Sequence, residues 1–183
     1  MFVYVNLGYY QWQELKRTGA LGISGDDGEC GKEMTDWLMG QMRRRLPPGT
    51  RIDAPIYTFM SKPPVHDFYP AKRAVCKVEV DITSAVRFDE NTYLQVLNSI
   101  NNGLHSFCSF SEEEDVARRH ASEQECLESY ERMFCAEDTP HRSVRWMGPV
   151  DPHAFVPFLT RAMVKKVWIY RNAKRLRAHP KRN

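Results

Sequence analysis

The sequence lacks the short patterns by which many enzyme and metal sites are recognised. It contains no Gly-x-Gly-x-x-Gly, Gly-x-Ser-x-Gly, His-Glu-x-x-His or Cys-x-x-Cys motif. Gly31-Lys32 ends a glycine-rich stretch, but Asp26 and Glu33 stand where a phosphate-binding loop needs a glycine and a Ser or Thr. We therefore expect neither a metal nor a cofactor, and we expect the protein to bind a partner rather than to catalyse a reaction.

The chain also lacks an even set of cysteines and any long apolar run. Its five cysteines are an odd number, which argues against a secreted disulfide scaffold and favours a reducing compartment. No stretch approaches the roughly 18 apolar residues of a membrane-spanning helix. The first six residues have neither the basic start nor the apolar core of a signal peptide. We expect a cytoplasmic protein without a membrane partner.

What is present fits one globular domain. The length of 183 residues, with 42% hydrophobic and 27% charged residues, is sufficient for a full core. Strand patterns separated by helical patterns predict an α+β fold, with a small, mostly antiparallel sheet packed by about four to six helices. We expect residues 1–172 to form this single domain and residues 173–183 to form a basic C-terminal tail.

Individual elements follow from periodicity and from capping signals. Apolar alternation and β-branched content predict strands, which we place at residues 2–6, 55–60, 74–82, 142–147 and 164–170. Helical spacing predicts helices around Trp12 and Leu15, over 34–42, over 89–103 and over 111–135. Ser111 and Ser122 each precede a glutamate by three residues, as in a capping box. Leu127 is expected to point inward, and Pro152 to open a brief helix.

Charge is unevenly distributed along the chain. Residues 161–183 contain nine of the 26 Lys and Arg residues and none of the 23 acids, so residues 1–160 carry a formal charge of −6. Ten acids and three arginines lie between Glu112 and Asp138, where a solvated helix face is the ordinary interpretation and mimicry of a nucleic-acid backbone the alternative. An acidic body with a basic end indicates a partner of negative charge.

The basic end supplies the candidate binding residues. Basic side chains release counterions from a phosphate backbone, and aromatic side chains can stack on bases. The rival interpretation is a solubilising tail that follows a core strand with buried aromatics. The candidate residues for contact with DNA, RNA or a partner are Lys165, Lys166, Trp168, Tyr170, Arg171, Lys174, Arg175 and Arg177.

A second candidate group lies on the strand predicted over 74–82. Glu79 and Asp81 are two residues apart, so they would share one face of that strand. Two neighbouring carboxylates can serve acid–base chemistry or hold a cation, although surface carboxylates are common on half-exposed sheets. An enzyme similar to NAD-dependent ADP-ribosyltransferases, with Tyr57 and Glu79 in its site, is one alternative function.

Several landmarks along the chain resemble the domain of unknown function 3841 family of bacterial and phage proteins. They are Trp12-x-x-Leu15 with Gly19, Asp36-Trp37-Leu38-Met39 through Met42, Pro55-Ile56-Tyr57-x-Phe59, Val78-x-Val80, Val96-Leu97-Asn98, Tyr130-Glu-Arg-Met-Phe134 and Val164-Lys-Lys-Val167. Tyr57 and Phe59 stand where the family has a tryptophan-rich strand, and Phe88-Asp89 retains its aspartate-containing turn only loosely. The resemblance implies no activity and no catalytic residue.

Similar small proteins occur on phages and mobile elements, and some inhibit host defence. The resemblance thus leads us to expect a non-enzymatic protein that acts in the bacterial cytoplasm. Its expected partner is a host defence nuclease such as a Cas9-type CRISPR effector complex, with DNA or RNA contact through the basic C-terminal segment. A plain nucleic-acid-binding accessory protein is the remaining alternative.

Overall fold

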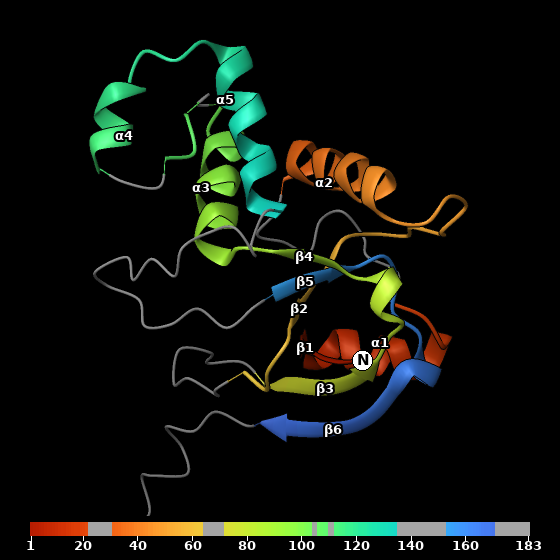
Figure 1. Ribbon diagram of the computed structural model, residues 1–183. Helices are drawn as coiled ribbons and strands as arrows, with labels where there is room; N and C mark the ends of the chain where they lie inside the picture. Colours follow the sequence, from red (N-terminus) through yellow and green to blue (C-terminus); the bar gives the residue numbers. More distant parts are fainter. Residues whose placement is uncertain (22–30, 64–71, 104–105, 110–111, 135–152, 171–183) are drawn as a thin grey trace, which may run out of the picture.

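The chain folds around one antiparallel sheet (Figure 1). The computed structural model describes residues 1–21, 31–63, 72–103, 106–109, 112–134 and 153–170. Six strands are hydrogen-bonded in the order β4-β5-β2-β1-β3-β6, and each neighbouring pair is antiparallel. The strands are β1 (Phe2–Gly8), β2 (Ile56–Phe59), β3 (Arg73–Glu79), β4 (Val86–Phe88), β5 (His153–Val156) and β6 (Val164–Tyr170).

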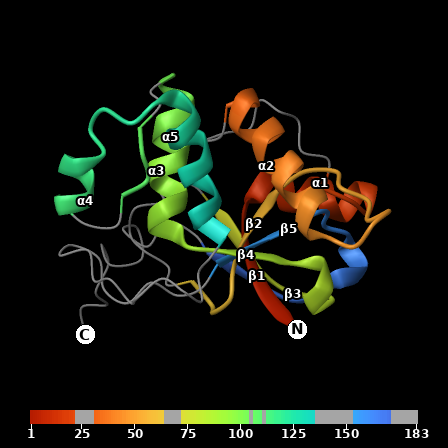
Figure 2. The same cartoon turned by 45° about the horizontal axis from the view of Figure 1, so that its top comes forward.

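Helices connect and cover the strands, which confirms the predicted α+β class. The α-helices are α1 (Tyr9–Thr18), α2 (Lys32–Arg45), α3 (Glu90–Asn101), α4 (Glu112–Ala117) and α5 (Glu123–Ser129). Three short 3-10 helices are η1 (Ile82–Ser84), η2 (Tyr130–Phe134) and η3 (Arg161–Met163). In Figures 1 and 2, α3 and α5 stand side by side, away from β3 and β6.

Local signals in the sequence explain several element ends. Gly19 closes α1 with a φ of 81°, a left-handed conformation that a residue with a side chain adopts only at a cost. Asp89 caps α3 by accepting a hydrogen bond from the backbone N–H of Thr92. Ser122 and Glu125 form the predicted capping box of α5. Ser111 and the strand predicted over 142–147 lie outside the described residues.

Three local predictions are wrong. The strand predicted over 74–82 ends at Glu79, and Ile82 is 58% exposed because it begins η1 instead of continuing the inward alternation. The brief helix expected after Pro152 is absent because His153–Val156 form β5, held between β2 and β4. Leu127 is 37% exposed, since the buried residues of α5 are Cys126 and Ser129.

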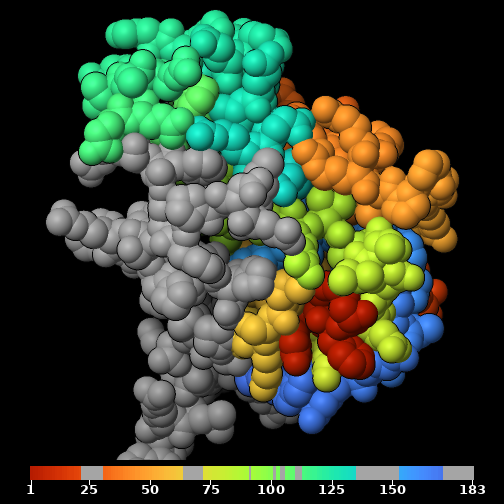
Figure 3. Space-filling view, in the orientation of Figure 1, coloured from red at the N-terminus to blue at the C-terminus, as the bar shows by residue number. Residues whose placement is uncertain are grey.

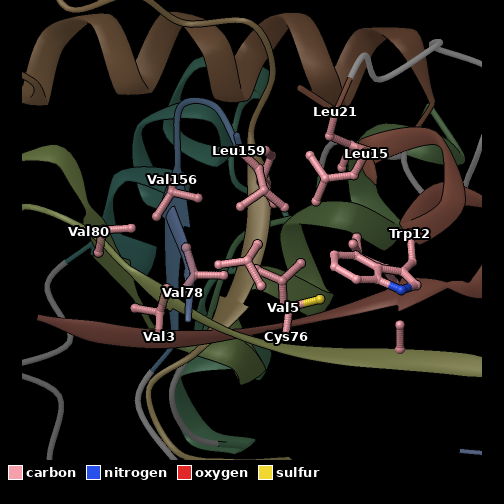
Figure 4. Close-up of a cluster of buried hydrophobic side chains, with 14 residues drawn as sticks. Val3, Val5, Trp12, Leu15, Leu21, Cys76, Val78, Val80, Val156 and Leu159 are labelled. Carbon is pink, nitrogen blue, oxygen red and sulfur yellow. The ribbon is translucent and has the colours of Figure 1, made fainter. Parts of the chain in front are cut away.

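A first core cluster lies on one side of β1, β3 and β6, under α1. Figure 4 shows Trp12 and Leu15 of α1 on the same side of the sheet as Val5 and Cys76. Val3, Val5 and Leu7 alternate inward along β1, and Ala74, Cys76 and Val78 do the same along β3. Burial of each such side chain contributes about 1.5–3 kcal/mol, so this cluster fixes which side of the three strands faces the interior.

A second core cluster lies between the other half of the sheet and the remaining helices. It takes Val86 and Phe88 from β4, Phe155 from β5, and side chains of α2, α3 and η2. The Phe88 and Phe155 rings stack with centroids 4.2 Å apart. No buried residue of this cluster comes from β1, β3 or β6, so its helices do not pack on the side of those strands opposite the first core cluster. On that side Trp168 and Tyr170 are partly exposed, and Val75 beneath them is 3% exposed.

Candidate functional site

We call this second side of β1, β3 and β6 the outer face. It lies opposite the first core cluster, and strand alternation assigns its members. On β1 and β3, the inward residues alternate with outward ones, and the register places Tyr4 opposite Lys77, Asn6 opposite Val75, and Gly8 opposite Arg73. On β6, Lys166 pairs with Lys77, Trp168 with Val75, and Tyr170 with Arg73. Side chains from three strands therefore form one continuous surface.

A β-bulge at Lys165 determines that Trp168 and Tyr170 belong to this face. Val164 pairs with Val78 and Lys166 with Lys77, so Lys165 is the extra residue in β6. Val164 lies in the first core cluster, and simple alternation from it would turn Trp168 and Tyr170 toward that core. The extra residue reverses the alternation, and Val167 packs against the core instead. The alternative of core-buried aromatics on this strand is therefore wrong.

Trp168 is the centre of the interactions on the outer face. Its partly exposed ring lies 6.2 Å from the Tyr4 ring, centroid to centroid, with 34° between their planes. The ammonium groups of Lys62 and Lys166 lie 4.4 Å and 4.9 Å from the Trp168 ring centroid. Two cations therefore flank one indole, at distances within the range of cation–π attraction.

Further cations surround this centre. Lys62 also lies 5.8 Å from the Tyr170 ring centroid, and Lys77 lies 4.1 Å from that of Phe2. The Arg73 guanidinium donates to the Asn6 side-chain carbonyl at 3.2 Å. Lys62, Lys77 and Lys166 thus interact on this surface through aromatic rings, and these contacts leave their positive charges in place.

Glu79 is the single carboxylate in β1, β3 and β6, and it is already neutralised. Its Oε2 lies 2.8 Å from Nζ of Lys165, and both side chains are about half exposed. The hydrogen bond and charge of Lys165 lower the pKa of Glu79. The pair therefore cancels itself, and the remaining charge of the outer face is positive.

Some of the residues predicted to contact a partner lie close together. Lys166, Trp168 and Tyr170 gather on the outer face, and Lys165 lies at its end in the ion pair. Arg171, Lys174, Arg175 and Arg177 lie outside the described residues. Sequence reasoning missed Tyr4, Lys62, Arg73 and Lys77. Alternation marks three of these as outward residues, but nothing local indicates that Lys62, in the loop after β2, reaches Trp168.

The carboxylates proposed for catalysis are separated by the structure. Asp81 lies beyond the end of β3, where it caps η1 by accepting from the N–H and hydroxyl of Thr83, and these bonds lower its pKa. Glu79 and Tyr57 stand on β3 and β2, with β1 between them, so about 10 Å separates their strands. The structure does not bring Tyr57 and Glu79 together, and an NAD-dependent activity stays a prediction.

Tyr57 belongs instead to an aromatic cluster around His153. The Tyr57 hydroxyl donates to Glu90 at 2.8 Å, and the same carboxylate oxygen lies 3.9 Å from Nε2 of His153. His153 is 3% exposed, with the rings of Tyr57 and Phe59 at 5.0 and 5.1 Å. These contacts join β2, β5 and the start of α3, and their immediate effect is to hold the second core cluster to the sheet.

The acidic helices occupy the far end of the molecule from the outer face. Figure 3 shows α4 and α5 (green to cyan) at the top, well away from β1 (red) and β6 (blue). Part of their charge is paired locally, through Glu114 with Arg132 and Glu125 with Arg118. The charge segregation predicted from the sequence therefore exists in space as well, at least between α4–α5 and β6.

Neither a second kind of site among the described residues nor a related protein gives a further indication of function. Within the described ranges, no group of three or more His, Cys, Asp or Glu side chains is placed to hold a metal ion. None of the helices described combines the length and apolar character needed to cross a bilayer. No family model, curated protein or solved structure matches the chain. The resemblance to the domain of unknown function 3841 family stays a prediction.

Proposed function

We propose that this protein binds nucleic acid, without catalysis, through the outer face of β1, β3 and β6. The observation that carries the proposal is the unbalanced charge of that face. Lys62, Lys77 and Lys166 gather there, while the one carboxylate of β1, β3 and β6, Glu79, is paired with Lys165. Lysines on β3, on β6 and in the loop after β2 thus bring positive charge to one face, and a phosphate backbone is attracted to such a face.

The distribution of acids supports the same conclusion. A polyanion is attracted to the sheet and repelled by α4 and α5, which lie at the other end of the molecule. The protein would thus meet its ligand with one side only. Six more basic residues follow Tyr170 in the sequence and add positive charge to the chain; they are Arg171, Lys174, Arg175, Arg177, Lys181 and Arg182. Both features favour a nucleic acid over a neutral ligand.

This proposal accommodates the expected partner without requiring it. A Cas9-type effector complex contains both guide RNA and DNA in positively charged channels, and nucleic acid that emerges from them is accessible to a second protein. A binding and cleavage assay with such a complex tests that partner. Lack of binding would remove the effector and leave the nucleic-acid face untouched, because the latter depends only on charge and geometry.

The direct test measures affinity for a labelled 20-nucleotide single strand by fluorescence anisotropy over a range of salt concentrations. The three lysines Lys62, Lys77 and Lys166 predict a log–log slope of affinity against salt of about −2, before any contribution from Arg73 or the tail. Substitution of Lys62, Lys77 and Lys166 together by alanine should reduce that slope by about 2. Failure to bind at low salt would contradict the proposal.

A charge-matched control separates a local site from general attraction. Lys32, Arg43 and Arg119 are exposed and lie on or beside helices, outside the outer face. Their combined substitution by alanine changes the net charge by the same three units. If it weakens binding as much as the outer-face variant does, the protein attracts nucleic acid without a defined site, and the assignment to the outer face fails.

A further inference from the structure

The aromatic residues of the outer face carry an inference about which form of nucleic acid binds there. Phosphate contacts alone do not distinguish a single strand from a duplex, because both present a repeating negative charge. Four rings lie on this face, those of Phe2 and Tyr4 on β1 and of Trp168 and Tyr170 on β6. Sheets that present aromatic rings on an open side bind unpaired bases by stacking.

The spacing of these rings favours bases that are not stacked on each other. Trp168 and Tyr170 are two residues apart on one side of a strand, which places them about 6.6 Å apart along β6. Consecutive bases in a duplex are about 3.4 Å apart and cover each other's faces. Neighbouring bases can reach both rings only in an extended strand, and a base pair within a duplex exposes no face to either ring.

The lysines around Trp168 are placed for the phosphates of the same strand. Lys62 and Lys166 now direct their ammonium groups at the indole, 4.4 Å and 4.9 Å from its centroid. A base that stacks on Trp168 takes the place of an ammonium group, and its own phosphodiester offers that group a full negative charge nearby. Exchange of a cation–π contact for an ion pair would therefore couple stacking to charge neutralisation.

We infer that the outer face is a binding site for single-stranded nucleic acid, in which unpaired bases stack on Trp168 and Tyr170 while Lys62 and Lys166 contact the flanking phosphates. This inference rests on the proposed function and narrows it from any nucleic acid to exposed bases. The Tyr4 ring lies 6.2 Å from the Trp168 ring, centroid to centroid, across β3. It therefore borders the same site and limits where a base can lie on the indole.

The test uses the full chain and three probes: a 12-nucleotide oligothymidine, an abasic phosphodiester of the same length, and a 12-base-pair duplex. The oligothymidine should bind about tenfold or more tightly than the abasic probe, since stacking is the sole contribution that the abasic probe lacks. It should also bind more tightly than the duplex. Equal binding of oligothymidine and the abasic probe would overturn base stacking but leave the proposed function intact. No binding of any probe would overturn both.

Variants at Trp168 identify the stacking residue. Trp168→Leu should bring the affinity for oligothymidine close to that for the abasic probe, and should leave the abasic probe almost unaffected. Trp168→Phe keeps a ring and should recover most of the loss. Unfolding midpoints of both variants, measured by circular dichroism, exclude a folding defect. Full affinity of a folded Trp168→Leu variant for oligothymidine would contradict the inference.

Discussion

Lys165 binds Glu79 at the one place where β6 shifts in register against β3. The ion pair and the bulge therefore involve the same residue. Lys165 is the additional residue of β6, and its side chain neutralises the carboxylate that ends β3 on the outer face. The presence of Lys165 determines to which side of the sheet the side chains after it in β6 point. Its positive charge neutralises Glu79, which would otherwise repel phosphate. Substitution and deletion separate these two effects.

Variants of Lys165, Glu79 and Lys166 should change the salt dependence of nucleic-acid binding according to the net charge that they leave on the outer face. The double variant Lys165→Ala with Glu79→Gln removes a neutral pair, so the salt dependence of affinity should stay the same. Lys166→Ala removes an unneutralised cation and should lower the magnitude of the slope by about 0.7. Glu79→Gln alone frees Lys165 and should tighten binding. Salt titrations by fluorescence anisotropy give all three values, and weaker binding by Glu79→Gln would contradict the charge assignment.

Deletion of Lys165 should destabilise the fold, whereas substitution should not. Without the extra residue, either Val164 leaves the first core cluster or Trp168 and Tyr170 turn into it. Loss of one buried valine or forced entry of large rings costs about 2 kcal/mol or more. Lys165→Ala keeps the register and should stay within about 0.5 kcal/mol of the wild type in urea unfolding. Equal stability of both variants would show that the bulge does not determine the register.

Two glycines in similar open surroundings should respond oppositely to alanine. A Cβ at Gly19 or at Gly40 meets no atom within 4 Å, so sterics at the side chain do not distinguish them. Gly19 has a φ of 81°, and Gly19→Ala should destabilise by about 1–2 kcal/mol. Gly40 lies inside α2 without a positive φ, and Gly40→Ala should stabilise by about 0.5–1 kcal/mol. Thermal unfolding of both variants gives the comparison, and equal signs would contradict it.

The capping box of α5 should make part of the stability depend on pH. The backbone N–H and hydroxyl of Ser122 donate to Glu125 and lower its pKa from the ordinary value of 4.5. A lowered carboxyl pKa stabilises the fold above the ordinary value, and that contribution disappears as pH falls through the folded-state pKa. Glu125→Gln should therefore be less stable than the wild type at pH 7, and the difference should shrink as pH falls below 4.5. A difference that stays constant as pH falls would show that the charge is irrelevant.

Much of the fold can be predicted from local patterns. The sequence-based boundaries of β1, α1 and β6 are correct or nearly so, because apolar alternation, the spacing of Trp12 and Leu15, and the stop at Gly19 all act locally. β5 could not be predicted in the same way. All four of its residues are buried, since it lies between two strands with both sides covered, and it therefore shows no alternation.

The candidate site shows the limit of the sequence more sharply. The sequence identifies one segment with aromatic and basic residues, namely Lys166, Trp168 and Tyr170. It does not indicate to which side of the strand these side chains point. That side depends on a bulge that appears only in the register with β3. The approach of Lys62 to Trp168 joins residues more than 100 positions apart, and the partnership of Tyr4 with Trp168 spans nearly the whole chain. Such contacts depend on the order of the strands in the sheet, and no local pattern in the sequence indicates them.

The bulge also has a genetic consequence. Insertion or loss of one codon is the smallest coding change that alters the number of residues in β6, whereas a substitution of Lys165 keeps that number. Chains otherwise like this one but one residue shorter between Val164 and Val167 would either turn the same aromatic residues toward the core or lose Val164 from it. Length at this point is thus a better marker of shared binding behaviour than the identity of the lysine itself.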